Sequence, residues 1–287
     1  MLSCSQEGAA GERGSLGERA LPGETVVCAD NLGYMRSLPD GFCHVIYADP
    51  PFSSCGAAWR PPRSNGIAAE PPPRSDEYLG LMVPRLVEMR RLLADRGSLF
   101  LHLDWRRVHY VKVELDGIFG ENNFLNELIW AYRSGGRPAP WFARQHDTIL
   151  WYAKQAGGHT FNRLRCGEYR TRDLCVAKDG RPYKSTRKGP IYFDPGGPAL
   201  ADVWDIPILS TVARERTGYP SQKPERLLER IILASSHEGD LVADFFCGSG
   251  TTLVVAKRLK RRWLGADISA EAQRVALGRI ANTIPSG

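Results

Sequence analysis

The chain has 287 residues, of which 43% are hydrophobic and 24% are charged, and its formal net charge is +6. This composition is typical of a globular protein with one or two domains, and it excludes a low-complexity chain. No apolar run reaches the length of about 18 residues that a transmembrane helix needs, so we expect no membrane partner. The positive charge suits a polyanionic partner such as a nucleic acid.

Cysteine and histidine spacing bears on metal binding and on cellular location. The seven cysteines are scattered without a C-x-x-C pair, and no histidines cluster at ligand spacing. We therefore expect no metal site, and reduced thiols in an intracellular protein. Residues 1–22 are rich in glycine and charge and contain no apolar signal-peptide core, so they predict a flexible tail on a cytoplasmic protein.

Strand and helix patterns alternate through the first half of the chain, as they do in an α/β fold. Strands are predicted at 25–29, 44–48, 98–103, 126–132 and 147–152, and helices at 32–38, 76–96 and 105–119. Residues 53–75 predict a long loop, and Pro84 allows a kink in the helix that follows it. The last two strands have no helix between them, so we expect antiparallel neighbours at one sheet edge.

The composition changes after this half. Between Lys154 and Lys188, ten basic residues face three acidic ones, and tyrosines are interleaved with them. We interpret residues 154–201 as an inserted region that contacts nucleic acid, with a solvated basic segment as the alternative. The candidates for contact with nucleic acid are Arg137, which precedes this region, and Arg163, Arg165, Arg170, Arg172 and Lys184 within it. Beyond the insertion, helices are predicted at 224–235, 251–259 and 270–282, and strands at 241–245 and 263–267.

One strand–turn–helix–strand unit carries a glycine-rich turn. Its first strand ends at Asp244. The turn that follows contains Gly248 and Gly250, and the second strand ends in Asp267. Glycines let a ligand approach the backbone, and the start of the helix favours an anionic group. Asp267 follows at about the spacing at which an acid binds ribose hydroxyls. The turn has neither the Walker lysine nor the third glycine of the dinucleotide fingerprint, so a purely structural turn is the alternative.

The second stretch of interest is Asp49-Pro50-Pro51-Phe52, which follows the predicted strand at 44–48. Two prolines fix the backbone and remove N–H donors, which leaves carbonyl groups and a carboxylate as acceptors. An exocyclic amine on a planar base offers two hydrogens to such acceptors, and Phe52 offers a face for stacking. The alternative is a proline-rich strand exit whose phenylalanine belongs to the core.

In their order along the chain, these motifs resemble the permuted, beta-type family of amino-group DNA methyltransferases. The tetrapeptide comes first, a basic middle follows, and the glycine turn of the form Asp-x-Phe-x-Gly-Ser-Gly-Thr-Thr comes last. Further blocks similar to the family are Asp30-Asn31-Leu32, Leu125-Asn126-Glu127-Leu128-Ile129-Trp130, Gln222-Lys223-Pro224-Glu225 and Arg261-Arg262-Trp263-Leu264-Gly265-Ala266-Asp267. Phe52 stands where the family more usually has tyrosine, and it keeps the stacking face.

The resemblance implies a Rossmann-like α/β fold, with a mixed, mostly parallel sheet and helices on both faces. It divides the chain into the tail 1–22, a catalytic half 23–153, a target-recognition insertion 154–201 and a cofactor-binding half 202–287. Catalysis would fall to Asp49, Pro50, Pro51 and Phe52, with Asp49 and the Pro50 carbonyl accepting the hydrogens of the target amine. S-adenosyl-L-methionine would be held by Asp30, Leu32, Lys223, Asp244, Phe246, Gly248, Ser249, Gly250, Thr251 and Asp267.

The favoured target is N6 of adenine in double-stranded DNA, because an aspartate opens the tetrapeptide. N4 of cytosine is the first alternative, an RNA or protein-glutamine methyltransferase the second, and a catalytically silent DNA-binding module the third. The resemblance leaves a cognate restriction enzyme and a homodimer open as partners. His102, His109 and His146 fit no catalytic pattern, and we expect structural roles for them.

Overall fold

The computed structural model describes residues 23–52, 75–133, 140, 142–167, 169 and 174–285. The expected tail, residues 53–74 of the predicted loop, and the DNA-contact candidates Arg137, Arg170 and Arg172 lie outside the described residues. Within the described part of the chain, none of the helices is long and apolar enough to cross a membrane.

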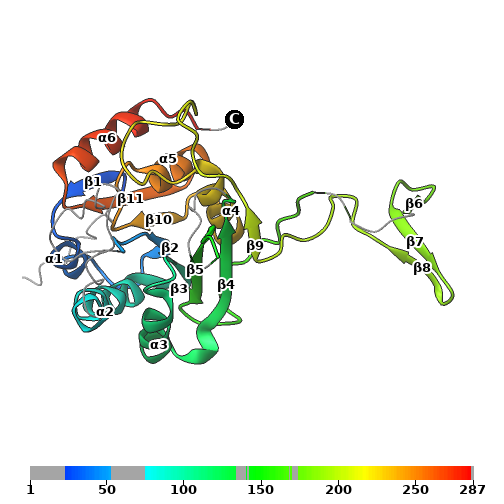
Figure 1. The fold of residues 1–287 in the computed structure, drawn as a ribbon, viewed down its shortest axis with the longest axis horizontal. Helices are drawn as coiled ribbons and strands as arrows, with labels where there is room; N and C mark the ends of the chain where they lie inside the picture. The colour runs from blue at the N-terminus through cyan, green and yellow to red at the C-terminus, as the bar shows by residue number, and fades with distance from the viewer. Residues whose placement is uncertain are drawn as a thin grey trace, which may run out of the picture.

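An eight-stranded sheet forms the centre of the molecule, in the order β1-β11-β10-β2-β3-β5-β4-β9 (Figure 1). Its first five strands run parallel, and β5 runs antiparallel to both β3 and β4. The short β9 then pairs parallel with β4. The bounds are β1 Thr25–Cys28, β2 Cys43–Ala48, β3 Leu93–Leu103, β4 Phe124–Ala131, β5 His146–Ala153, β9 Val203–Asp205, β10 Leu241–Asp244 and β11 Arg262–Asp267.

Helices cover both faces of this sheet, as the Rossmann-like prediction requires. One face carries α1 (Asn31–Arg36), α2 (Ser75–Leu92) and α3 (Val108–Phe119), and a 3₁₀ turn at Glu121–Asn123 leads on to β4. The other face carries α4 (Glu225–Ser235), α5 (Thr251–Arg258) and α6 (Ala270–Ala281).

Two separate apolar cores result from this layering, because successive side chains of a strand point to opposite faces. In β2, Ile46 and Ala48 join the core beneath α1–α3, whereas Val45 and Tyr47 join the core beneath α4–α6. The nearly continuous apolar sequence of this strand is therefore explained by burial on both sides.

Most of the predicted elements are present, and two details of the sheet differ from the prediction. Strand β3 begins at Leu93 rather than at 98, because Leu93 pairs with Cys43 across a register shift before the regular ladder starts. The antiparallel pair β4–β5 is confirmed, but β9 occupies the sheet edge beyond it. Pro84 lies inside α2, which runs unbroken over Ser75–Leu92.

The inserted region carries a small sheet of its own. Strands β6 (Cys175–Val176), β7 (Pro182–Thr186) and β8 (Gly189–Tyr192) pair antiparallel with one another and not with the central sheet. This arm projects from the body of the molecule, as Figure 1 shows. At its base, a single bridge joins Arg165 to Ala199.

Candidate functional site

The two motifs meet because their strands are neighbours. Strands β10 and β2 are parallel, with Asp244 opposite Tyr47. Asp49 therefore follows two residues later, at the side of the sheet where the carboxyl-terminal ends of these strands lie. Asp267 ends β11, the other neighbour of β10. The cavity at this edge has a volume of about 490 Å³, and its walls include Asp49, Asp244 and Asp267. This is the edge at which open α/β sheets bind their ligands.

The glycine turn is held by the acid that follows it in the next strand. Asp267 accepts the Gly248 N–H at one carboxylate oxygen (2.9 Å) and the Ser269 N–H at the other (2.9 Å). Gly248 has a φ of +48°, and a β-carbon there would come within 3.3 Å of the Tyr219 ring. Both carboxylate oxygens of Asp267 thus support the cavity wall, and Asp267 itself still lines the cavity.

Gly250 has a different role from the one that a ligand-contacting glycine would have. It caps α5 with a φ of +75°. A β-carbon there would come within 2.6 Å of the Ala276 β-carbon in α6. Gly250 does not line the cavity. Its lack of a side chain therefore serves the contact between α5 and α6.

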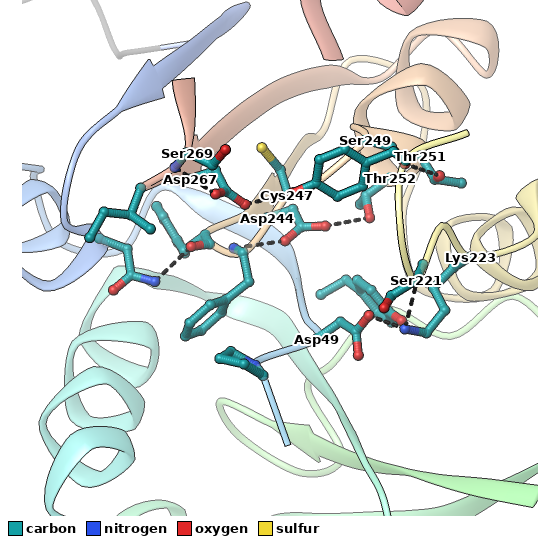
Figure 2. Close-up of a pocket in the computed structure, with 18 of the residues that line it drawn as sticks. Asp49, Ser221, Lys223, Asp244, Cys247, Ser249, Thr251, Thr252, Asp267 and Ser269 are labelled. Carbon is teal, nitrogen blue, oxygen red and sulfur yellow. Dashed lines mark hydrogen bonds and ion pairs between the residues drawn. The ribbon is translucent and has the colours of Figure 1, made fainter. Parts of the chain in front are cut away.

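Asp244 is a buried acid at the centre of the cavity wall. Its carboxylate accepts the Phe246 N–H at 3.0 Å and the Thr252 hydroxyl at 2.6 Å (Figure 2). Burial, assisted by the nearby charges of Asp49 and Asp267, raises the pKa of Asp244 to about 7, against the lowering effect of these two hydrogen bonds. A cationic ligand beside Asp244 would favour its ionised form.

Asp49 lies between a lysine and a histidine. One of its oxygens pairs with the Lys223 ammonium group, which also lines the cavity (Figure 2). The other oxygen lies 3.8 Å from Nδ1 of His102, a fully buried residue of β3. His102 Nδ1 is 2.7 Å from the Tyr47 hydroxyl, and Nε2 is 3.3 Å from Asp147. Burial raises the pKa of Tyr47 well above its ordinary value, so this phenol stays protonated beside His102.

The rest of the tetrapeptide is fixed by its neighbours. Pro50 is buried, and Pro51 lines the cavity. The Phe52 ring lies 5.8 Å from the His102 ring, and the Phe52 carbonyl accepts a hydrogen bond from Arg107 Nε at 3.0 Å. The Lys223 ammonium group is also 5.8 Å from the centre of the Phe52 ring.

The far end of the cavity is bounded by the start of α1. Asp30 caps this helix by accepting the Gly33 N–H at 3.0 Å, and it pairs with Arg85 of α2 at 2.7 Å. Arg85 also donates to Asn31, whose amide donates to the Phe245 carbonyl at 2.7 Å. This network joins the end of β10 to α1 and α2 around the opening.

The structure brings most of the predicted cofactor residues into one cavity. Those that line it are Asp30, Lys223, Asp244, Phe246, Gly248, Ser249, Thr251 and Asp267. Leu32 and Gly250 do not line it. Sequence reasoning did not single out Arg85, Tyr219 or Glu271, which do line it, because helix and loop residues distant in sequence carry no motif. It also missed the position of His102 behind Asp49.

The three predicted DNA-contact residues that the structure describes, Arg163, Arg165 and Lys184, do not line this cavity. Arg163 is exposed, and Lys184 is exposed on β7 of the arm. Arg165 instead holds the base of the arm, because it pairs with Asp194 at 2.8 Å and donates to the Gly197 carbonyl at 2.8 Å. Among the described residues, no group of three or more histidine, cysteine, aspartate or glutamate side chains could hold a metal ion.

Comparison with known proteins connects this geometry to a family. A family model, N6_N4_Mtase, described as DNA methylase, matches residues 43–278, which include both motifs and the arm. The chain belongs to this DNA methylase family. It is 29% identical over 266 residues to the DNA adenine methyltransferase YhdJ of Escherichia coli (strain K12), which covers 90% of this chain and 82% of that protein.

Solved structures show the same methylase fold. The crystal structure of an M1.HpyAVI–SAM complex has a TM-score of 0.57 at 20% identity and covers 89% of this chain and 98% of that one. The PvuII DNA methyltransferase, described as cytosine-N4-specific, has a TM-score of 0.60 at 17% identity, with 90% and 86% covered. The proteins similar to this chain thus include one named for adenine and one named for cytosine N4.

Proposed function

We propose that this DNA methylase transfers a methyl group from S-adenosyl-L-methionine to N6 of adenine in double-stranded DNA. The observation that carries the proposal is the shared cavity of Asp49 and the Gly248 turn. A methyl donor and a target amine must meet at one point, and a cavity with both motifs in its walls supplies that point. Membership in the family supports the same reaction class.

The cavity suits this cofactor in size and in charge. A volume of about 490 Å³ lies within the range of small-molecule sites. Asp244 and the turn at 246–251 would hold the methionine part, Asp267 the ribose hydroxyls, and Asp30 the region of the adenine. When bound, the cofactor supplies an electrophilic methyl group on a cationic sulfur, which the carboxylates of the wall complement.

Asp49 would act by accepting hydrogens of the target amine, together with the Pro50 carbonyl. This directs the nitrogen lone pair toward the methyl group, so that catalysis rests on alignment and electrostatics. Because Asp49 pairs with Lys223, an incoming amine competes with the lysine for the carboxylate. Cys247 takes no part as a nucleophile, because burial raises the pKa of its thiol far above neutrality.

The arm is the proposed site of target recognition, within residues 154–201. Lys184 and Arg181 lie exposed on or beside β7, and the Arg181 guanidinium lies 4.5 Å from the centre of the Tyr192 ring. Basic and aromatic side chains together suit a contact with DNA. We further propose a cognate restriction enzyme as a partner, a homodimer as the oligomeric state and the cytoplasm as the location. Size-exclusion chromatography with light scattering tests the homodimer.

Replacing Asp49 tests the catalytic role. Asp49→Ala should lower methyl transfer to DNA by at least about 10²-fold, because the amine loses its main acceptor, while cofactor affinity stays within about twofold. Transfer of tritiated methyl groups to DNA measures turnover, and calorimetry measures the affinity for the cofactor. Asp95→Ala is the matched control, since it removes an exposed carboxylate at the opposite edge of the sheet. Equal loss of cofactor affinity and of turnover in Asp49→Ala would contradict the assignment.

Cytosine N4 is the second candidate target, because it presents a similar amine and a protein of this fold is described as specific for it. Mass spectrometry of nucleosides from methylated DNA separates the two products directly. N6-methyladenine supports the proposal, and N4-methylcytosine replaces it with the alternative.

A further inference from the structure

A tryptophan with two arginines stands at the catalytic edge, outside the cavity described above. Trp105 follows the end of β3 and keeps 44% of its surface exposed, an unusual position for the largest apolar side chain. The guanidinium carbon of Arg144 lies 3.8 Å from the centre of a Trp105 ring, and that of Arg106 lies 4.8 Å away. Two cations from separate segments thus rest on one indole.

This cluster, Trp105 with Arg106 and Arg144, is attached to the catalytic motif. Strands β2 and β3 are parallel neighbours, so Trp105 and Asp49 emerge at the same sheet edge. The adjacent Arg107 is buried, lies 4.5 Å from the centre of the Tyr78 ring, and donates a hydrogen bond to the Phe52 carbonyl. The position of the cluster is therefore fixed relative to the tetrapeptide.

The chemistry of the cluster suits a phosphodiester. A guanidinium group stacked on an aromatic ring keeps its N–H donors in its own plane, where they can bind phosphate oxygens in pairs. The nearby acid does not face outward: Asp104 is 95% buried, accepts the Arg106 N–H at 3.0 Å and pairs with the Arg106 guanidinium. Phe142, two residues before Arg144, is 97% exposed and adds an apolar ring to the same segment.

We propose that Trp105, Arg106 and Arg144 bind the phosphate backbone of the DNA strand that carries the target base. The proposal rests on the proposed function and adds a contact site on the body of the molecule, separate from the arm. An enzyme that takes a base out of the helix must hold the backbone close to that base. A phosphate-binding site connected through Arg107 to Phe52 would hold the backbone there. Such a site positions the DNA without recognising its base sequence.

Fluorescence anisotropy with a labelled duplex of mixed sequence tests the site at a series of salt concentrations. Arg144→Gln should weaken binding roughly three- to tenfold and lower the slope of log K against log salt by about 0.9, the value for one lost phosphate contact. Lys260→Gln is the control, because it removes an exposed cation after α5, at the opposite edge of the sheet. The affinity of Lys260→Gln for DNA and the slope of its log K against log salt should match those of the wild type.

Trp105→Leu provides the sharper test, because it leaves the net charge unchanged. It removes the platform under both guanidinium groups, so the affinity for DNA should fall roughly threefold or more at low salt. Thermal melting of each variant checks that the fold is intact. DNA affinities of Arg144→Gln and Trp105→Leu equal to that of Lys260→Gln would overturn the proposal. Failure of the wild type to methylate any DNA would instead refute the proposed function, which the binding measurements do not test.

Discussion

The protonation of Asp244 offers a quantitative test of the proposed cofactor site. Burial raises the pKa of this carboxyl to about 7, so it is about nine-tenths ionised near pH 8 and about one-tenth ionised near pH 6 in the unliganded protein. A cationic ligand binds the ionised form, and its affinity should therefore fall about tenfold between these pH values, equivalent to ~1.4 kcal/mol.

Calorimetric titration of S-adenosyl-L-methionine at a series of pH values measures this dependence. The amino group of the ligand titrates near pH 8, and the variant Asp244→Asn separates that contribution from the contribution of the carboxyl. Asn keeps the shape and an acceptor for the Thr252 hydroxyl, so the fold should be retained. The variant should bind more weakly at pH 8 and lose the carboxyl-dependent slope. The same slope in wild type and variant, or a wild-type affinity that rises as the pH falls, would refute the reasoning.

The same shift has a consequence for stability with a defined sign. Because the pKa of about 7 in the folded protein lies above the ordinary aspartate value of 3.8, the stability contributed by Asp244 is fully present below about pH 3.8 and is lost as pH rises through 7. The loss in free energy of unfolding amounts to about 4 kcal/mol for a pKa that rises from 3.8 to about 7. Relative to the wild type, Asp244→Asn should therefore become more stable to urea as pH rises from about 4 to 7.

Two further substitutions test how the site is supported. Gly250→Ala should destabilise the fold by about 2–4 kcal/mol in urea denaturation, because the new side chain is strained in the left-handed backbone conformation and also clashes with Ala276. Gly157→Ala is the control: its φ is +80° and no atom lies within 4 Å, so it should show the backbone strain alone. Equal losses in the two variants would exclude the clash. His102→Phe retains an aromatic ring but removes the contacts to Tyr47 and Asp147, so turnover should fall about tenfold while cofactor affinity is kept. Unchanged turnover would show that His102 only fills space.

The sequence was sufficient for both motifs and for the order of the strands and helices outside residues 154–223, because apolar periodicity and turn residues are local signals. The start of β3 at Leu93 was not predictable, since an apolar residue at the end of a helix pattern also fits a strand. The three-residue β9 is too short to show any periodicity. Its place at the sheet edge depends on pairing with β4, which is a long-range contact.

The residues of the candidate site also fall into two groups, those that local sequence patterns indicate and those that only long-range contacts bring together. Acids and glycines at strand ends were found because their chemistry is tied to a position in a βαβ unit. His102 was assigned a structural role because a buried strand residue looks alike whether it contacts Asp49 or only apolar neighbours. The ion pair between Lys223 and Asp49 joins residues 174 positions apart in the chain, so no local pattern could indicate it.

The isolation of the arm has a consequence for how this enzyme could diversify. Strands β6, β7 and β8 pair only with one another, and neither of the two apolar cores includes a residue from them. Substitutions on the arm therefore leave the packing around the cavity at Asp49 and Asp244 untouched. On the proposal that the arm reads the target sequence, new recognition sequences could accumulate there without renewed selection for folding, and exchange of arms between relatives would retarget the enzyme.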